Sequence, residues 1–152
     1  MSSERTLVLV KPDGVQRGLA GEIIGRIERS GLRISALKLL QMEREVAERH
    51  YAEHVGRPFY EGLVGFITSG PVVAMCVDGP SAISSVRRLM GATNPQESAP
   101  GTIRGDLSVE IGRNLVHGSA GPEDATREIG IFFENSEIVE YERAVDAWIV
   151  ES

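Results

Sequence analysis

Cysteine, lysine and long apolar runs are all scarce or absent in this sequence of 152 residues. Cys76 is the only cysteine, so no internal disulfide can form, and its apolar neighbours indicate a buried, inert thiol. No apolar run reaches the roughly 18 residues that a membrane helix needs. The first five residues show no cleavable signal pattern. We therefore expect a cytoplasmic protein that does not bind membranes.

Positive charge is carried almost entirely by arginine, because Lys11 and Lys38 are the only lysines among 16 cationic residues. The formal net charge is −6, which argues against the basic surface of a nucleic-acid-binding protein. We therefore expect no nucleic-acid partner. The length and a hydrophobic content of 41% suit a single domain over residues 1–152.

The common phosphate-binding motifs are also missing. The pattern GxxxxGK[ST] is absent because neither lysine follows a glycine, and Gly14, Gly18, Gly21 and Gly25 do not give GxGxxG. Any nucleotide binding must therefore use another arrangement of side chains.

Hydrophobic periodicity predicts four strands separated by helices. The strands are expected over residues 6–10, 32–42, 72–77 and 115–117, and the helices over 19–29, 43–54, 58–67, 81–90 and 122–129. In the third of these helices, Phe59, Leu63, Phe66 and Ile67 share one face and are more typical of a core. The segment 11–14 is expected to be a turn. Residues 91–111 lack a sustained period, and loops of this length are usually functional or disordered.

This order of elements reduces to βαββαβ, the arrangement of a ferredoxin-like fold in the α+β class. It predicts an antiparallel four-stranded sheet with helices on one face and a long loop before the last strand. The fold alone does not specify the chemistry.

One histidine stands out in the short predicted strand before Gly118 and Ser119. Taken alone, His117 would more often be a structural hydrogen-bonding residue than a catalytic one. Two other segments give it context, namely Lys11-Pro12-Asp13-Gly14 after the first strand and the irregular loop at 91–111.

Together these segments resemble the nucleoside diphosphate kinase family, and the resemblance covers nearly the whole chain. The family's fold is ferredoxin-like, which agrees with the arrangement predicted from periodicity. The NxxHGS element is the most specific match. The resembling stretches are KPDGVQRG (11–18), RPF (57–59), SGPVVAM (69–75), GATNP (91–95), PGTIRGD (100–106) and NLVHGS (114–119).

The resemblance implies a ping-pong phosphotransferase with a phosphohistidine intermediate. His117 matches the nucleophile that accepts the γ-phosphate of a nucleoside triphosphate, and a neutral imidazole suits that role. Glu128 matches the carboxylate that orients it. Tyr51 and Ser119 match residues beside the histidine, with Ser119 a candidate hydrogen-bond partner of Glu128, and Lys11 completes the catalytic set.

The resemblance also implies the nucleotide site. Lys11, Arg87 and Arg104 match cationic phosphate contacts, Thr93 adds a hydroxyl, and Asn114 matches the residue that contacts the ribose. Phe59 matches the aromatic residue that stacks on the base, with Leu63 and Ile111 lining the same cleft. Because every base offers a π face, such a site should accept purines and pyrimidines, with ribose or deoxyribose.

Mg²⁺ is expected to arrive bound to the nucleotide phosphates, and the sequence shows no dedicated metal cage. Members of the family form tetramers or hexamers, so a homo-oligomer is expected, with a hexamer favoured and a tetramer possible. In many members the loop corresponding to residues 91–111 contributes to hexamer contacts.

Two other functions deserve comparison. His50-Tyr51-Ala52-Glu53-His54 fits the HxxEH pattern of inverted zinc proteases, but three fixed positions in five residues arise easily by chance. A non-enzymatic nucleotide-sensing or scaffolding module would be favoured if His117, Lys11 or Arg104 were replaced, and all three are present.

Overall fold

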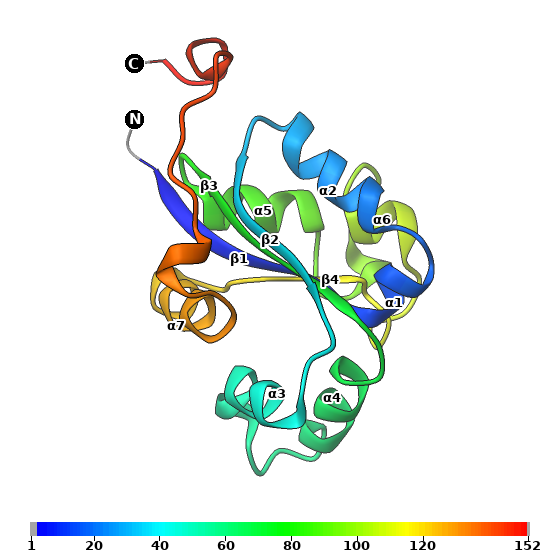
Figure 1. Ribbon diagram of the computed structural model, residues 1–152. Coiled ribbons are helices and arrows are strands. Elements are labelled where there is room, and N and C mark those ends of the chain that lie inside the picture. The colour runs from blue at the N-terminus through cyan, green and yellow to red at the C-terminus, as the bar shows by residue number, and fades with distance from the viewer. Residues whose placement is uncertain (1–2, 152) are drawn as a thin grey trace.

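The computed structural model describes residues 3–151 and contains one antiparallel sheet (Figure 1). Its strands are β1 (Glu4–Val10), β2 (Arg33–Leu40), β3 (Val72–Gly79) and β4 (Val116–Gly118), in the spatial order β2-β3-β1-β4. Every neighbouring pair is antiparallel, and β2 and β4 lie at the edges. The predicted four-stranded ferredoxin-like arrangement is confirmed.

Helices cover both faces of this sheet, so the prediction that they cover one face is wrong. α2 (Ala20–Arg29) and α5 (Ala82–Met90) pack on the face that carries Val8 and Val10. α3 (Arg44–His50), α4 (Tyr60–Ile67) and α7 (Pro122–Phe132) cover the face of Leu7 and Leu9. The physical reason is that β1 and β3 are apolar at both odd and even positions, and every residue of β3 is buried.

The buried face of α4 also differs from the prediction. Val64 and Ile67 enter the core with Ala47 of α3, whereas Leu63 and Phe66 are only half-buried and Phe59 is 50% exposed. The helix begins at Tyr60, so Phe59 is its N-cap and extends outside the helical stripe.

Some segments are more ordered than their sequence suggests. The expected turn after β1 is a short helix, α1 (Pro12–Gln16). Segment 91–111 contains a 3₁₀ turn at Pro95–Glu97 and α6 (Ile103–Leu107). The Asn94 and Thr102 side chains accept hydrogen bonds from the first-turn amides of these two elements and cap them.

The helix expected over 43–54 is interrupted. α3 ends at His50, and Ala52–His54 forms a separate 3₁₀ turn. His50 and His54 therefore do not occupy successive turns of one helix, which removes the geometric basis of the HxxEH interpretation.

After α7 the chain forms a 3₁₀ turn at Asn135–Glu137 and then runs beside β2. The Val139 amide donates to the Ser35 carbonyl at 2.8 Å, and the Tyr141 hydroxyl donates to the Ile34 carbonyl at 2.6 Å. A last 3₁₀ turn, Asp146–Trp148, leaves Trp148 90% exposed. In residues 3–151 no helix is long and apolar enough to cross a membrane.

Candidate functional site

Strand alternation determines which way His117 points. In the β1–β4 ladder, His117 lies opposite Leu9, and Val116 and Gly118 lie opposite Val10 and Val8. Residues directly opposite in an antiparallel ladder share a face of the sheet. His117 therefore shares the face of Leu9, which α3 and α7 cover, while Val116 packs toward α5.

The glycine after His117 allows α5 to approach the strand closely. A Cβ atom on Gly118 would lie 2.9 Å from the Met90 sulfur and 3.1 Å from a methyl carbon of Val86. Both distances are shorter than ordinary van der Waals contacts, so glycine permits this packing.

α7 brings Glu128 to the histidine ring. His117 Nε2 lies 2.9 Å from Glu128 Oε1, and the Ser119 hydroxyl donates to the same oxygen at 2.7 Å. Ser119 is fully buried and accepts a hydrogen bond from the Leu7 amide at 3.2 Å. Strand β1 thus anchors the serine, the serine anchors the carboxylate, and the carboxylate orients the imidazole.

The protonation of Glu128 decides which imidazole nitrogen is reactive. Burial raises the pKa of Glu128, but hydrogen bonds from His117 and Ser119 outweigh it, so the net pKa lies below its usual value. An anionic carboxylate can only accept, so Nε2 of His117 carries a hydrogen and donates it. In the neutral ring Nδ1 then keeps its lone pair and is the nucleophilic atom. The side chain is 24% exposed.

A left-handed residue links this strand to the segment after β1. Leu115 has a φ of 73°, which is uncommon for a residue with a side chain, and it is fully buried. Its amide donates to Asp13 Oδ2 at 3.0 Å, and its carbonyl accepts from the Lys11 amide at 2.8 Å. These two bonds hold the kink and join KPDG to NLVHGS, although the two motifs lie about 100 residues apart in the chain.

Two arginines bind the outer side of β4. Arg104 is buried and donates to the carbonyls of Asn114 at 3.1 Å, Gly91 at 3.2 Å and Val116 at 2.7 Å. Arg87 donates to the carbonyl of Gly118 at 3.2 Å. Both guanidinium groups are therefore next to His117. The adjacent Arg88 is exposed and lines a different cavity, near Ser30 and Gly31.

Lys11 is held by Asn114. Its ammonium group donates to Asn114 Oδ1 at 2.7 Å, and Asn114 Nδ2 donates to the Thr93 carbonyl at 2.9 Å. Thr93 is an exposed residue near the start of segment 91–111. Asn114 therefore connects the lysine to that segment.

No acidic side chain within residues 3–151 forms an ion pair with these cations, although Asp13 lies close enough to offset part of the charge of Lys11. Burial and the charge of Arg104 lower the pKa of Lys11 to about 8, and burial and the charge of Arg87 lower the pKa of Arg104 to about 10. The ion pairs found within residues 3–151 include none of the three cations. An anion such as phosphate would relieve their mutual repulsion.

The apolar residues expected at the base lie at the surface. Phe59 is 50% exposed, Ile111 is 55% exposed, and Leu63 is half-buried. The ring of Phe59 meets His54 edge-on, with centroids 5.3 Å apart. The interpretation of Phe59 as a core residue is therefore wrong, and an exposed flat ring remains available to a ligand.

Two aromatic rings, those of His50 and Tyr51, lie next to one another beside His117. Tyr51 meets His50 edge-on at 4.7 Å between centroids, and His50 meets His117 edge-on at the same distance. Burial and the charge of Glu128 raise the pKa of Tyr51 to about 12, so its hydroxyl keeps its proton at neutral pH.

Sequence reasoning missed two residues of this site. Asp13 belongs to the recognised KPDG motif, but no spacing in the sequence connects it with the Leu115 amide. The sequence connects His50 only with His54, through the HxxEH pattern, whereas the fold places it beside His117 and Glu128, residues distant in the chain.

Two parts of the site differ in the metal ions that they could accept. The region of Lys11, Arg87 and Arg104 is cationic, so Mg²⁺ fits there only when nucleotide phosphates provide its oxygen ligands. Among the described residues, one cluster could hold a metal ion directly, namely His50, His117 and Glu128.

Comparison with known proteins gives concordant results. A family model described as nucleoside diphosphate kinase matches residues 4–138. A nucleoside diphosphate kinase of Archaeoglobus fulgidus is 62% identical over 97% of this chain and 98% of its own length, and one of Thermomicrobium roseum is 60% identical over 97% and 99%. A halophilic nucleoside diphosphate kinase from Halobacterium salinarum, solved in complex with CDP, superposes with a TM-score of 0.96 at 51% identity, covering 99% of this chain and 100% of that one.

Proposed function

Since the chain belongs to the nucleoside diphosphate kinase family, we propose how its residues carry out the reaction of a phosphotransferase of this kind. The enzyme transfers the γ-phosphate of a nucleoside triphosphate to a nucleoside diphosphate. Our proposal is that the phosphoryl group resides briefly on His117 and that both substrates use one pocket in turn. The observation that carries it is the bond between His117 Nε2 and Glu128, which leaves Nδ1 as the free nucleophile.

In the first half-reaction, Nδ1 of His117 attacks the γ-phosphorus. A nitrogen–phosphorus bond forms while the bond to the bridging oxygen breaks, and the electron pair of that bond leaves with the nucleoside diphosphate. The phosphorylated ring retains its Nε2 hydrogen and becomes cationic, and Glu128 stabilises that charge. The second half-reaction reverses these steps with a different nucleoside diphosphate.

Positioning and positive charge supply most of the catalysis in phosphoryl transfer. We assign Lys11, Arg87 and Arg104 to the phosphate oxygens, with the Thr93 hydroxyl as an additional donor. Asn114 would contact the ribose while it holds Lys11 in place. Mg²⁺ bound with the nucleotide would offset phosphate charge, and these residues would orient the complex. Tyr51 keeps its proton, so its hydroxyl would be available as a hydrogen-bond donor beside His117.

The base would stack on Phe59, with Leu63 and Ile111 in apolar contact. This exposed apolar surface supports broad specificity, because strong discrimination requires hydrogen bonds to base edges. The Halobacterium salinarum relative was solved with CDP, a pyrimidine nucleoside diphosphate, and we extend that ligand class to this chain.

We also propose a homo-oligomer, with a hexamer favoured and a tetramer as the alternative, formed by one cytoplasmic domain over residues 1–152. The support is apolar surface: on edge strand β2, Leu37 is 53% and Leu39 67% exposed, and Trp148 is 90% exposed. Light scattering after size-exclusion chromatography distinguishes six subunits from four.

The central test is phosphoenzyme labelling. Incubation with ATP labelled at the γ-phosphate should give an acid-labile, base-stable label that is discharged by any added nucleoside diphosphate. His117→Ala should lose the label, and His54→Ala, the matched histidine control, should retain it. An equal label on His117→Ala would refute the assignment of the nucleophile.

A further inference from the structure

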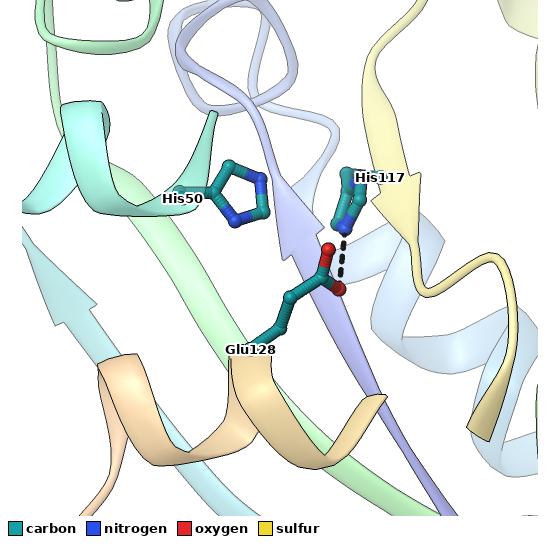
Figure 2. A group of neighbouring side chains, drawn as sticks. All are labelled: His50, His117 and Glu128. Carbon is teal, nitrogen blue, oxygen red and sulfur yellow. Dashed lines mark hydrogen bonds and ion pairs between the residues drawn. The ribbon is translucent and has the colours of Figure 1, made fainter. Parts of the chain in front are cut away.

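His50, His117 and Glu128 form a compact group at the base of the active site. They come from α3, β4 and α7, and one potential ligand atom from each lies within 4.8 Å of the other two. Figure 2 shows the two imidazole rings and the carboxylate converging on one small region. A cavity of about 250 Å³ opens beside them and is also lined by Asp124 and Arg127.

The phosphotransfer mechanism leaves the His50 imidazole without a role. The residue is 4% exposed, and its Nδ1 is buried without a hydrogen-bond partner among residues 3–151. A phenylalanine would keep the edge-on contacts with Tyr51 and Phe132 and would bury no unsatisfied polar atom. Its ring instead lies against His117, with centroids 4.7 Å apart, and one of its nitrogens belongs to the group of three potential ligand atoms.

We propose that His50, His117 and Glu128 form a binding site for a divalent transition-metal ion of the Zn²⁺ type, and that this ion inhibits the enzyme. Two imidazoles and one carboxylate, with a fourth position open to solvent, form a common zinc-ligand set. The two nitrogen ligands favour Zn²⁺ and similar ions over Mg²⁺, which prefers oxygen.

Metal binding requires small shifts in the distances between the three ligands. Zinc bonds to nitrogen and oxygen are about 2.0–2.2 Å long, so tetrahedral ligands lie roughly 3.3–3.5 Å from one another. His117 and Glu128 would separate slightly from their 2.9 Å contact, and the most distant pair, within 4.8 Å, would approach. His50 is the last residue of α3, and a modest rotation of its side chain would serve this purpose.

The inhibition follows from proton positions, and this part of the inference rests on the proposed function. The metal takes the Nε2 lone pair of His117, and the hydrogen of Nε2 is transferred to Nδ1. No proton is released from the neutral ring, but Nδ1 loses its free lone pair and cannot attack phosphorus. Phosphorylation at Nδ1 keeps the hydrogen on Nε2, so phosphoenzyme and metal complex exclude each other.

The surrounding charges partly oppose this site. Arg127 lies 3.6 Å from Glu128 Oε2, and it is also 3.7 Å from Asp124, which offsets part of its charge. Lys11 is another cation close enough to affect His50. Arg127→Gln should therefore bind the metal more tightly than the wild type.

Direct binding tests the site without any assay of activity. Metal-free enzyme is titrated with Co²⁺, followed by its visible absorption, and with Zn²⁺ by calorimetry. The wild type and His54→Ala should each bind one ion per chain with the same affinity. His54 is the matched control because it lines the same cavity. His50→Phe should bind more than about tenfold more weakly, and circular dichroism checks that it is folded. Equal affinity of folded His50→Phe and wild type would overturn the proposal.

Phosphorylation provides a second, independent comparison. Phosphoenzyme freed of nucleotide by gel filtration should bind Zn²⁺ more than about tenfold more weakly than unphosphorylated enzyme. Unchanged affinity would refute the mutual exclusion. If enzyme freed of transition metals took up no phosphate from the Mg²⁺ complex of ATP, the proposed function would fail, whereas the Co²⁺ titration would still decide the metal site.

Discussion

Replacing Glu128 by glutamine isolates the effect of its negative charge on His117. The side chains have the same shape, and the buried Ser119 hydroxyl donates to Glu128 Oε1 at 2.7 Å. Because an amide nitrogen cannot accept that bond, the glutamine should keep its oxygen toward Ser119 and His117. His117 would remain oriented, but its Nε2 would donate to a neutral oxygen.

The magnitude follows from the type of hydrogen bond. A bond to a charged group contributes roughly 1.5–3 kcal/mol and a neutral one about 1 kcal/mol, so Glu128→Gln should lose about 0.5–2 kcal/mol when the phosphorylated ring becomes cationic. This corresponds to a decrease in kcat of about 2–30-fold. Glu128 is 4% exposed and has no proposed contact with the nucleotide, so KM should change little.

A coupled steady-state assay measures both constants, and rapid-quench labelling measures phosphoenzyme formation. Glu128→Ala is the useful comparison, because it also removes the hydrogen-bond acceptor of Ser119 and the orientation of the ring. It should lose considerably more kcat than Glu128→Gln. Wild-type kcat in Glu128→Gln, or an effect confined to KM, would refute this account of the carboxylate.

Three further results are expected. With a pKa lowered to about 8, Lys11 is protonated below that pH and neutral above it, so KM for the nucleotide should rise from pH about 7 to about 10, and a flat profile would argue against a phosphate contact. Arg104→Lys cannot reproduce three bonds to backbone carbonyls, so kcat/KM should fall about a hundredfold, and a loss of under about threefold would contradict its role. Ser119→Ala leaves the Leu7 amide without its partner and should reduce the free energy of unfolding by about 1–3 kcal/mol in urea denaturation, whereas an unchanged value would show that this bond contributes nothing.

The elements that sequence predicted well are those governed by local pattern. β1 and β3 are apolar runs, and α2 and α5 carry a clear helical stripe, so their approximate positions follow from periodicity. The sequence also allowed the second covered face to be predicted, since the six consecutive apolar residues 72–77 of β3 must be buried on both sides.

The remaining errors come from tertiary contacts. α6 is only five residues long and depends on the Thr102 cap and on Arg104, whose carbonyl partners come from distant segments. The position of Phe59 outside the core depends on where α4 begins.

The candidate site likewise has residues that the sequence could identify and residues that only the fold brings together. The catalytic and nucleotide residues could be named because their motifs resemble those of a known family, and their roles stay predictions until variants are measured. His50 carries no such signal, because its relation to His117 arises only when α3 folds over β4.

The hydrogen bonds of Arg87 and Arg104 have a consequence for solubility. β4 is an edge strand, and the carbonyls of Val116 and Gly118 accept from these arginines on the side away from β1. Open edge strands can recruit strands from other molecules and so begin aggregation. The two guanidinium groups occupy acceptors that an incoming strand would use. The two arginines proposed as phosphate ligands therefore also protect the sheet from intermolecular pairing, and a variant that weakens one property should weaken the other.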